Sequence, residues 1–186
     1  MILSDTTIKK YIESGKIEVK PDFDFQDISP VGIRVYLDKE ILIPEPNQYV
    51  NLRQPTELKY KRIDIREKGY ILKPGEFVLG ATFERIRTAR NILTMLDGRS
   101  TIARLGLTTH ITAGVIDGKY DTPKSIVLEI KNVGNFNFHL NYKDPIGMIY
   151  FVRLTEPVVH QIEDRYKAQS NGGVMAPNLF HKPLGK

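Results

Sequence analysis

Cysteine is missing from the 186 residues of this sequence. Its absence excludes disulfide bonds, a cysteine nucleophile and every zinc site built on thiolates. It also excludes the zinc-dependent route to nucleobase deamination, because that chemistry uses a His/Cys/Cys or three-Cys site to activate water. A deaminase built from this chain must therefore activate its water without zinc.

Long apolar runs are missing as well, since no stretch approaches the roughly 20 residues that a membrane-spanning helix needs. The opening residues, Met1 to Asp5, have no basic segment followed by an apolar one, as a secretory signal would. With 41% hydrophobic and 26% charged residues, the composition is typical of a soluble globular domain. We therefore expect a cytoplasmic protein that does not associate with membranes.

The formal net charge of +5 is compatible with two kinds of partner, nucleic acid or a polyanionic small molecule. The basic residues are spread along the chain rather than gathered in one run. We do not expect nucleic-acid binding on charge alone, and a small anionic ligand remains open.

A helix is predicted at the start of the chain. Ser4 suits the N-cap, Asp5 lies in the first turn, and Ile8 and Ile12 repeat at helical spacing. Gly15 is expected to end this helix.

Beyond Gly15 the pattern changes to short apolar runs broken by glycine, proline, asparagine and aspartate, which predicts a mainly β fold of the jelly-roll or barrel type with a few short helices. A short buried helix is expected over 101–107, with Ile102, Ala103 and Leu105 as its apolar members, and another helix over 163–169. We expect residues 1–160 to form the β domain and residues 161–186 a C-terminal arm. The predicted strands include 33–37, 41–43, 77–81, 126–130 and 146–154.

The first candidate site is the segment 97–106. Gly98 before Arg99 and Ser100 offers backbone N–H groups, a hydroxyl and a guanidinium to one anion, and Arg104 follows Ser100 by four residues. The guanidinium fork matches phosphate or carboxylate oxygens. An N-capped helix with solvated arginines explains the same residues equally well.

The second candidate is the segment 110–120. Ala113 and Gly114 are small enough to let a ligand reach the backbone, and Asp117 could act as a general base or lie near a metal-bound phosphate. A β-turn aspartate in an ordinary hairpin is the commoner meaning of a lone Asp-Gly pair.

Glu129 interrupts an apolar run, residues 126–130. Burial of a carboxylate is costly unless it is paired or neutral, and it suits a group that takes and gives a proton. The alternation of Val127, Glu129 and Lys131 also fits a polar strand face turned to water.

The segment 165–169 precedes a glycine-rich stretch. Arg165, Tyr166 and Gln169 could belong to a basic arm that folds over a polyphosphate as a lid. A solvated tail is the commoner meaning of such a segment.

Taken in this order, these signals resemble the dCTP deaminase branch of the dUTPase-like superfamily. Residues 99–106 (Arg-Ser-Thr-Ile-Ala-Arg-Leu-Gly) look like that branch's Arg-Ser-Ser-Leu-Ala-Arg-Leu-Gly signature. Further matches are the family's His-x-Thr-Ala at 110–113, its Leu-Glu at 128–129, its Leu-x-Pro-Gly-Glu-Phe at 72–77, the opening residues 1–5, and Tyr166-x-x-Gln169-Ser170.

The resemblance implies a distorted jelly-roll subunit, a homotrimer with active sites between subunits, and dCTP or dUTP bound with Mg²⁺ through the triphosphate, with no zinc and no direct protein ligand to the metal. It gives Glu129 the role of proton-shuttling carboxylate, with Ser100 and the Ala113 backbone holding the attacking water and the base edge. Ser100, Arg104 and Gln169 are implied to bind phosphates, and Arg165 stands where a lysine is usual. The implied substrate-binding set is Arg99, Ser100, Thr101, Arg104, Thr112, Ala113, Gly114, Val115, Tyr120, Arg165, Tyr166 and Gln169.

Gly114-Val115 resembles the deaminases that continue to dUMP, whereas those that stop at dUTP tend to have His-Arg there. Residues 114–120 are also similar to the dUTPase motif Gly-Val-Ile-Asp-x-x-Tyr, which implies that Asp117 orients the water attacking the α-phosphate and that Tyr120 packs on the deoxyribose. The chain departs from the family at 121–124, in the long basic loop 45–66, and at Gly32 and Arg34, where a serine and an aspartate are common.

Three functions follow in order of preference. The first is deamination of dCTP followed by cleavage to dUMP and pyrophosphate. The second is a dUTPase without deaminase activity, which Glu129 disfavours because pure dUTPases generally lack a glutamate there. The third is a non-catalytic relative that binds nucleotides or nucleic acid.

Overall fold

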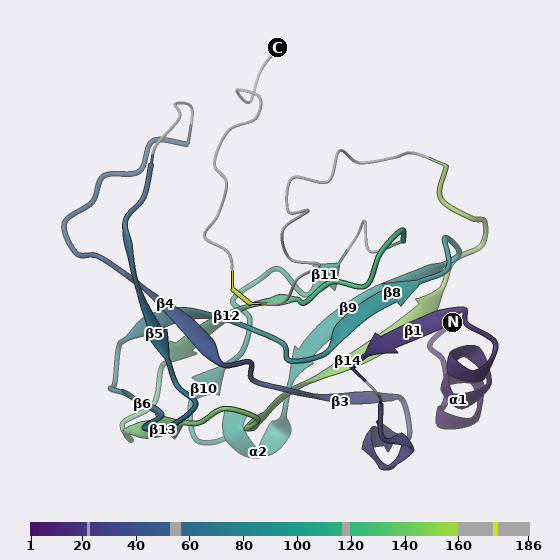
Figure 1. Cartoon of the computed structure of the whole chain (residues 1–186), viewed down its shortest axis with the longest axis horizontal. Helices are drawn as coiled ribbons and strands as arrows, with labels where there is room; N and C mark the ends of the chain where they lie inside the picture. The colour runs from purple at the N-terminus through teal and green to yellow at the C-terminus, as the bar shows by residue number, and fades with distance from the viewer. Residues whose placement is uncertain (22, 53–56, 117–119, 160–172, 175–186) are drawn as a thin grey trace.

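The structure, a computed structural model, describes residues 1–159 except 22, 53–56 and 117–119, together with residues 173–174. The described residues are mainly strands, with a few short helices (Figure 1). The helical elements are α1 (Asp5–Glu13), the 3₁₀ turn η1 (Phe25–Asp27) and α2 (Ser100–Ala103). The strands are β1 (Ile17–Lys20), β2 (Ile28–Ser29), β3 (Gly32–Tyr36), β4 (Glu40–Pro44), β5 (Tyr60–Asp64), β6 (Tyr70–Leu72), β7 (Phe77–Ala81), β8 (Arg85–Thr88), β9 (Ile92–Gly98), β10 (Leu107–Thr108), β11 (Val115–Ile116), β12 (Val127–Asn132), β13 (Phe138–Leu140) and β14 (Pro145–Arg153).

Two five-stranded antiparallel sheets form the body of the domain. The first, named here the β14 sheet, has the order β11-β9-β14-β3-β2, and the second, the β12 sheet, has the order β10-β12-β7-β4-β5. Two short ribbons, β1-β8 and β13-β6, complete the described sheets. This arrangement confirms the prediction of a mainly β, jelly-roll-like fold with few helices.

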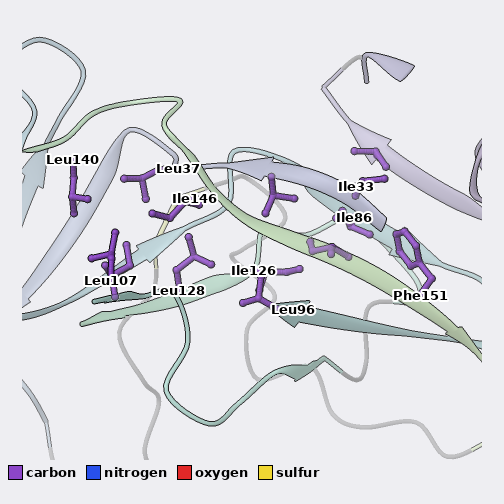
Figure 2. Packing of buried hydrophobic residues seen from close by; sticks show 14 of the residues in the cluster. Ile33, Leu37, Ile86, Leu96, Leu107, Ile126, Leu128, Leu140, Ile146 and Phe151 are labelled. Carbon is purple, nitrogen blue, oxygen red and sulfur yellow. The ribbon is translucent and has the colours of Figure 1, made fainter. Parts of the chain in front are cut away.

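One apolar core fills the space between the two sheets. Ile33 and Ile149 contribute from the β14 sheet, and Leu128 and Ile130 from the β12 sheet, and all four are fully buried. Figure 2 shows Leu128 among the side chains that gather between the strands. Each such side chain stabilises the fold by about 1.5–3 kcal/mol, so the alternation of apolar residues sets which face of each strand points inward.

The predicted N-terminal helix is confirmed as α1. Ser4 is its N-cap, and the side chain of Asp5 accepts a hydrogen bond from the Thr6 N–H at 2.7 Å. Gly15 has φ +70°, a conformation that costs glycine little. In Figure 1 α1 lies beside β1 at one end of the molecule.

The second helix differs from its prediction. Instead of a buried helix over 101–107, α2 covers only Ser100–Ala103, with Ile102 half-buried and Ala103 and Leu105 exposed. The chain turns away at Gly106, whose φ of +92° ends helical geometry. A Cβ on Gly106 would lie 2.5 Å from the Gly134 backbone, so this glycine is required by close packing.

The outer face of the β12 sheet carries a smaller apolar cluster, which consists of Leu42, Leu79, Ala81 and Val174. Val174 is only 2% exposed, and the Gly173 N–H donates a hydrogen bond to Asp38 Oδ2 at 3.1 Å. These two residues of the expected C-terminal arm therefore lie against the sheet. The rest of residues 161–186, including the expected helix at 163–169, lies outside the described residues, and the division into domain and arm stays a prediction.

Within the described part of the chain, no helix has the length and apolar character needed to span a membrane.

Candidate functional site

Glu129 points to the outer face of the β12 sheet. Its register partner on β7 is Leu79, so its side chain lies on the same face as the cluster that includes Val174. The Glu129 side chain is half-buried rather than turned freely to water. The interpretation of Val127, Glu129 and Lys131 as a polar strand face turned to water is therefore incomplete, because this face of the β12 sheet is partly covered.

Two hydrogen bonds hold the segment 109–111 beside Glu129. The Glu129 N–H donates to the Thr109 carbonyl at 3.1 Å, and Glu129 Oε2 accepts from the Ile111 N–H at 3.0 Å. A carboxylate can accept about four hydrogen bonds, so the contact with Ile111 orients the group and leaves it able to bind water. The Glu129 carboxylate is therefore held in place beside an exposed segment of the chain.

The residues after Ile111 form that accessible segment. Thr112 and Ala113 are exposed, and Val115 is exposed at the start of β11. The Gly114 carbonyl accepts from the Leu96 N–H at 2.8 Å, and a Cβ at Gly114 would lie 3.0 Å from the Leu96 carbonyl oxygen. A side chain at this position would crowd β9, so glycine favours this close approach.

His110 connects this segment with the end of β9. Its Nε2 lies 3.6 Å from Asp97 Oδ1. His110 Nδ1 and Thr109 Oγ1 are both buried and find no hydrogen-bond partner among the described residues. A Cβ at Gly98 would lie 3.4 Å from Thr109 Oγ1, so the 97–98 turn packs directly on this segment.

A hollow of about 330 Å³ lies where this turn leads into α2. Among the described residues its lining contains two arginines and three hydroxyl side chains but no carboxylate. Arg99 is held there by a hydrogen bond from its Nη1 to the Pro145 carbonyl at 3.0 Å. The hollow is therefore suited to an anion. Its lining is Ser29, Arg34, Gly98, Arg99, Ser100, Thr101, Gly147 and Met148.

The predicted site residues thus fall into two groups in this chain. Arg99, Ser100 and Thr101 line the hollow together, whereas Glu129 and Ala113 are not part of its lining. Arg104 is exposed just beyond α2, and Tyr120 is half-buried after β11. Four further predicted residues, Asp117, Arg165, Tyr166 and Gln169, lie outside the described residues.

Arg34 and Ser29 line the hollow but were not among the predicted site residues. Arg34 alternates with buried Ile33 and Val35 in β3, so its side chain points to the outer face of the β14 sheet. Two features of the sequence could have drawn attention to Arg34. It is a charged residue inside an apolar strand, and it stands where the family commonly has an aspartate. The sequence does not show that β3 lies near α2.

A second, acidic hollow of about 210 Å³ contains Glu84, which the sequence gave no reason to select. Glu84 is 6% exposed, and its Oε2 accepts from the Tyr36 N–H at 2.9 Å. Burial, with a smaller contribution from the nearby charges of Asp27 and Asp38, raises the pKa of Glu84 to about 7, and the bond from Tyr36 opposes this shift.

Comparison with known proteins identifies the class to which this fold and site belong. The model of the dCTP deaminase-like family matches residues 2–154, so the chain belongs to that family.

Two relatives both carry the name dCTP deaminase, dUMP-forming. The relative from Kocuria rhizophila is 30% identical and covers 99% of both chains. The relative from Mycobacterium tuberculosis is 36% identical over 86% of this chain and 84% of its own. The crystal structure of 2'-deoxycytidine 5'-triphosphate deaminase from Agrobacterium tumefaciens shares the fold, with a TM-score of 0.62 and 17% identity over 81% of this chain and 47% of that one.

Proposed function

We propose that this protein deaminates dCTP at C4 without zinc and then cleaves the product to dUMP and pyrophosphate. The observation that carries the proposal is the half-buried Glu129 carboxylate, hydrogen-bonded to the Ile111 N–H beside the exposed residues Thr112 and Ala113. Relatives named dUMP-forming dCTP deaminases, which match over most of both chains, support it.

In the first step Glu129 takes a proton from a water molecule that attacks C4 of the cytosine ring. Glu129 then returns the proton to the departing amino group, so that dCTP and water give dUTP and ammonia. Ser100 and the Ala113 backbone hold the water and the base edge. This chemistry needs a fixed carboxylate and main-chain groups that a base can reach; the hydrogen bond from the Ile111 N–H to Glu129 and the exposure of residues 112–113 support it.

In the second step water attacks the α-phosphorus of dUTP, and pyrophosphate leaves. Asp117 orients this water, and Tyr120 packs on the deoxyribose. Gly114 and Val115 support this step, because they resemble the pattern of deaminases that continue to dUMP rather than that of deaminases that stop at dUTP. Arg104, Arg165, Tyr166 and Gln169 complete the phosphate contacts.

Mg²⁺ is proposed to enter with the triphosphate. The hollow beside Ser100 is lined by guanidinium and hydroxyl groups, which fit phosphate oxygens rather than a bare cation. As the family resemblance implies, the phosphate oxygens would be its main ligands. Bound in this way, Mg²⁺ would neutralise charge on the phosphates.

The assembly is proposed to be a homotrimer with active sites between subunits. Within one chain Ser100 lines a hollow that does not include Glu129. Two functional groups that lie apart in a monomer can meet when a symmetric oligomer places one subunit against the next.

The direct test incubates the purified protein with Mg²⁺ and either dCTP or dUTP, followed by separation of the nucleotides and assay of ammonia and pyrophosphate. Ammonia and pyrophosphate from dCTP, with dUMP as product, are expected. Untouched dCTP with cleavage of dUTP would instead identify a dUTPase, and no reaction with either substrate would refute the catalytic proposal.

Two variants separate the steps. Glu129→Gln should lower the rate of ammonia release by at least about 100-fold, because the amide cannot shuttle a proton. Asp117→Asn should retain ammonia release and lose pyrophosphate release. Thermal unfolding of both variants serves as the control for folding. Near-normal deamination by Glu129→Gln would refute the role of Glu129 as the proton-shuttling carboxylate.

A further inference from the structure

Two arginines from different parts of the chain line the hollow beside α2. Arg99 precedes α2, and Arg34 comes from β3, which is separated from β9 by the central strand β14. Met148 on β14 pairs with Arg34 on one side and Asp97 on the other, so all three side chains lie on one face of the sheet. Neighbouring strands lie about 4.8 Å apart, which places Arg34 and the 97–99 turn roughly 10 Å from each other across the hollow.

Each arginine is oriented by a contact that leaves other donors available. Arg34 Nη1 lies 3.2 Å from Asp27 Oδ1, and the side chain remains 44% exposed. Asp27 is itself held by the Tyr36 hydroxyl at 2.6 Å and lines the acidic hollow rather than this one. A guanidinium has five N–H donors. An ion pair through Nη1 therefore orients the Arg34 guanidinium and leaves other N–H donors available to a ligand.

The remaining polar groups of this lining are hydroxyls. Ser100 and Thr101 lie at the start of α2, and Ser29 is fixed by a hydrogen bond from its Oγ to the Gly32 carbonyl at 3.1 Å. Two guanidinium groups from separate segments, together with hydroxyl side chains in the same lining, match an extended polyanion better than a single phosphate.

We propose that Arg34 and Arg99 both bind the phosphate chain of the nucleoside triphosphate in this hollow, and that Arg34 contributes selectivity for triphosphates over monophosphates. This inference rests on the proposed function for the identity of the substrate. The hollow's affinity for a polyphosphate chain does not depend on it.

The test uses the full-length protein and three variants: Arg34→Gln, Arg34→Lys and, as a matched control, Arg66→Gln. Arg66 follows β5 and also pairs with a carboxylate, that of Asp64; its side chain is 56% exposed, compared with 44% for Arg34, and it is not part of the hollow's lining. Inorganic tripolyphosphate binding is measured by calorimetry, and KM and kcat are measured with dCTP. Comparison of dCTP with dCMP as competing ligands distinguishes the triphosphate chain from a single phosphate.

Loss of a guanidinium that binds a charged ligand weakens binding by about tenfold or more. Arg34→Gln should therefore raise the tripolyphosphate Kd and the dCTP KM about tenfold, leave kcat within about twofold because the contact is remote from C4, and leave dCMP binding unchanged. Arg34→Lys should lie between wild type and Arg34→Gln, since it retains the charge without the fork. Arg66→Gln should behave like wild type.

The outcomes for the two proposals are distinguishable. Unchanged tripolyphosphate affinity and KM in Arg34→Gln, or no tripolyphosphate binding by the wild-type protein, would overturn the role of Arg34 even if dCTP is deaminated. Tripolyphosphate binding that depends on Arg34 in a protein that does not deaminate dCTP would retain the anion site and refute the proposed function. Arg34→Lys keeps a cation beside Asp27, so it remains informative if Arg34→Gln folds poorly.

Discussion

Replacement of Glu84 by glutamine tests how the fold responds to pH. Glu84 is 6% exposed in the acidic hollow, where burial and the nearby Asp27 and Asp38 charges raise its pKa from an ordinary 4.5 to about 7. The folded state therefore binds more protons than the unfolded state between about pH 4.5 and 7. The stability that depends on protonated Glu84 is fully present below about pH 4.5 and is lost as the pH rises through about 7.

The shift also sets the size of the effect. A change of one pKa unit corresponds to about 1.4 kcal/mol, so a shift from 4.5 to about 7 makes ionised Glu84 cost about 3 kcal/mol of folding free energy. This is an upper limit, because the 210 Å³ hollow is large enough to admit water that solvates the charge.

Glu84→Gln removes the ionisation and retains an oxygen that can accept the Tyr36 N–H. At pH 8.5 the variant should be more stable than wild type by about 1–3 kcal/mol, and near pH 5 the two should agree within about 1 kcal/mol. Urea unfolding followed by circular dichroism at a series of pH values measures this. The matched control is Glu156→Gln at an exposed position, which should leave the pH dependence unchanged. A constant difference between Glu84→Gln and wild type from pH 5 to 8.5 would refute the reasoning.

Two further predictions concern packing and assembly. Asn132 is fully buried, and its side chain donates hydrogen bonds to the Leu72 and Phe136 carbonyls at 3.1 and 2.7 Å. Asn132→Ala should therefore lower the free energy of unfolding, measured by urea titration, by about 3 kcal/mol. A loss below about 1 kcal/mol would contradict this prediction. If active sites form between subunits, coexpression of the inactive variants Ser100→Ala and Glu129→Gln should restore up to about a quarter of wild-type activity, since random mixed trimers each regain one intact site. Complete inactivity of the mixed trimers, isolated with two different affinity tags, would place both groups in one subunit.

Much of the fold could be predicted because local patterns have local causes. Helix α1 begins after Ser4 and ends before Gly15 as expected, and β7 covers the expected residues 77–81. The expectation for α2 was wrong because hydrophobicity alone does not say whether a residue is covered. Leu105 is apolar but exposed, since the chain turns at Gly106 to pack on Gly134.

The site could be predicted only in part, because some of its residues are neighbours in the chain and others are brought together only by folding. Arg99, Ser100 and Thr101 are neighbours in the chain, so their gathering in one hollow follows from their order. Arg34 joins them because β14 pairs with both β3 and β9, which brings together residues that are far apart in the chain. Glu84 looks like any other glutamate in the sequence, and only the elements packed around it raise its pKa.

By itself, the amino-acid sequence determined the β-rich class, the α1 boundaries, the exclusion of thiolate chemistry and the motif order that marks the family, because each depends on residue type and short-range spacing. The tertiary structure decided that Glu129 is half-buried and bonded to the Ile111 N–H, that Arg34 and Arg99 line one hollow, and that Val174 covers the sheet face which carries Glu129. These features depend on strand register and on contacts between distant segments, which the packing of the whole chain sets.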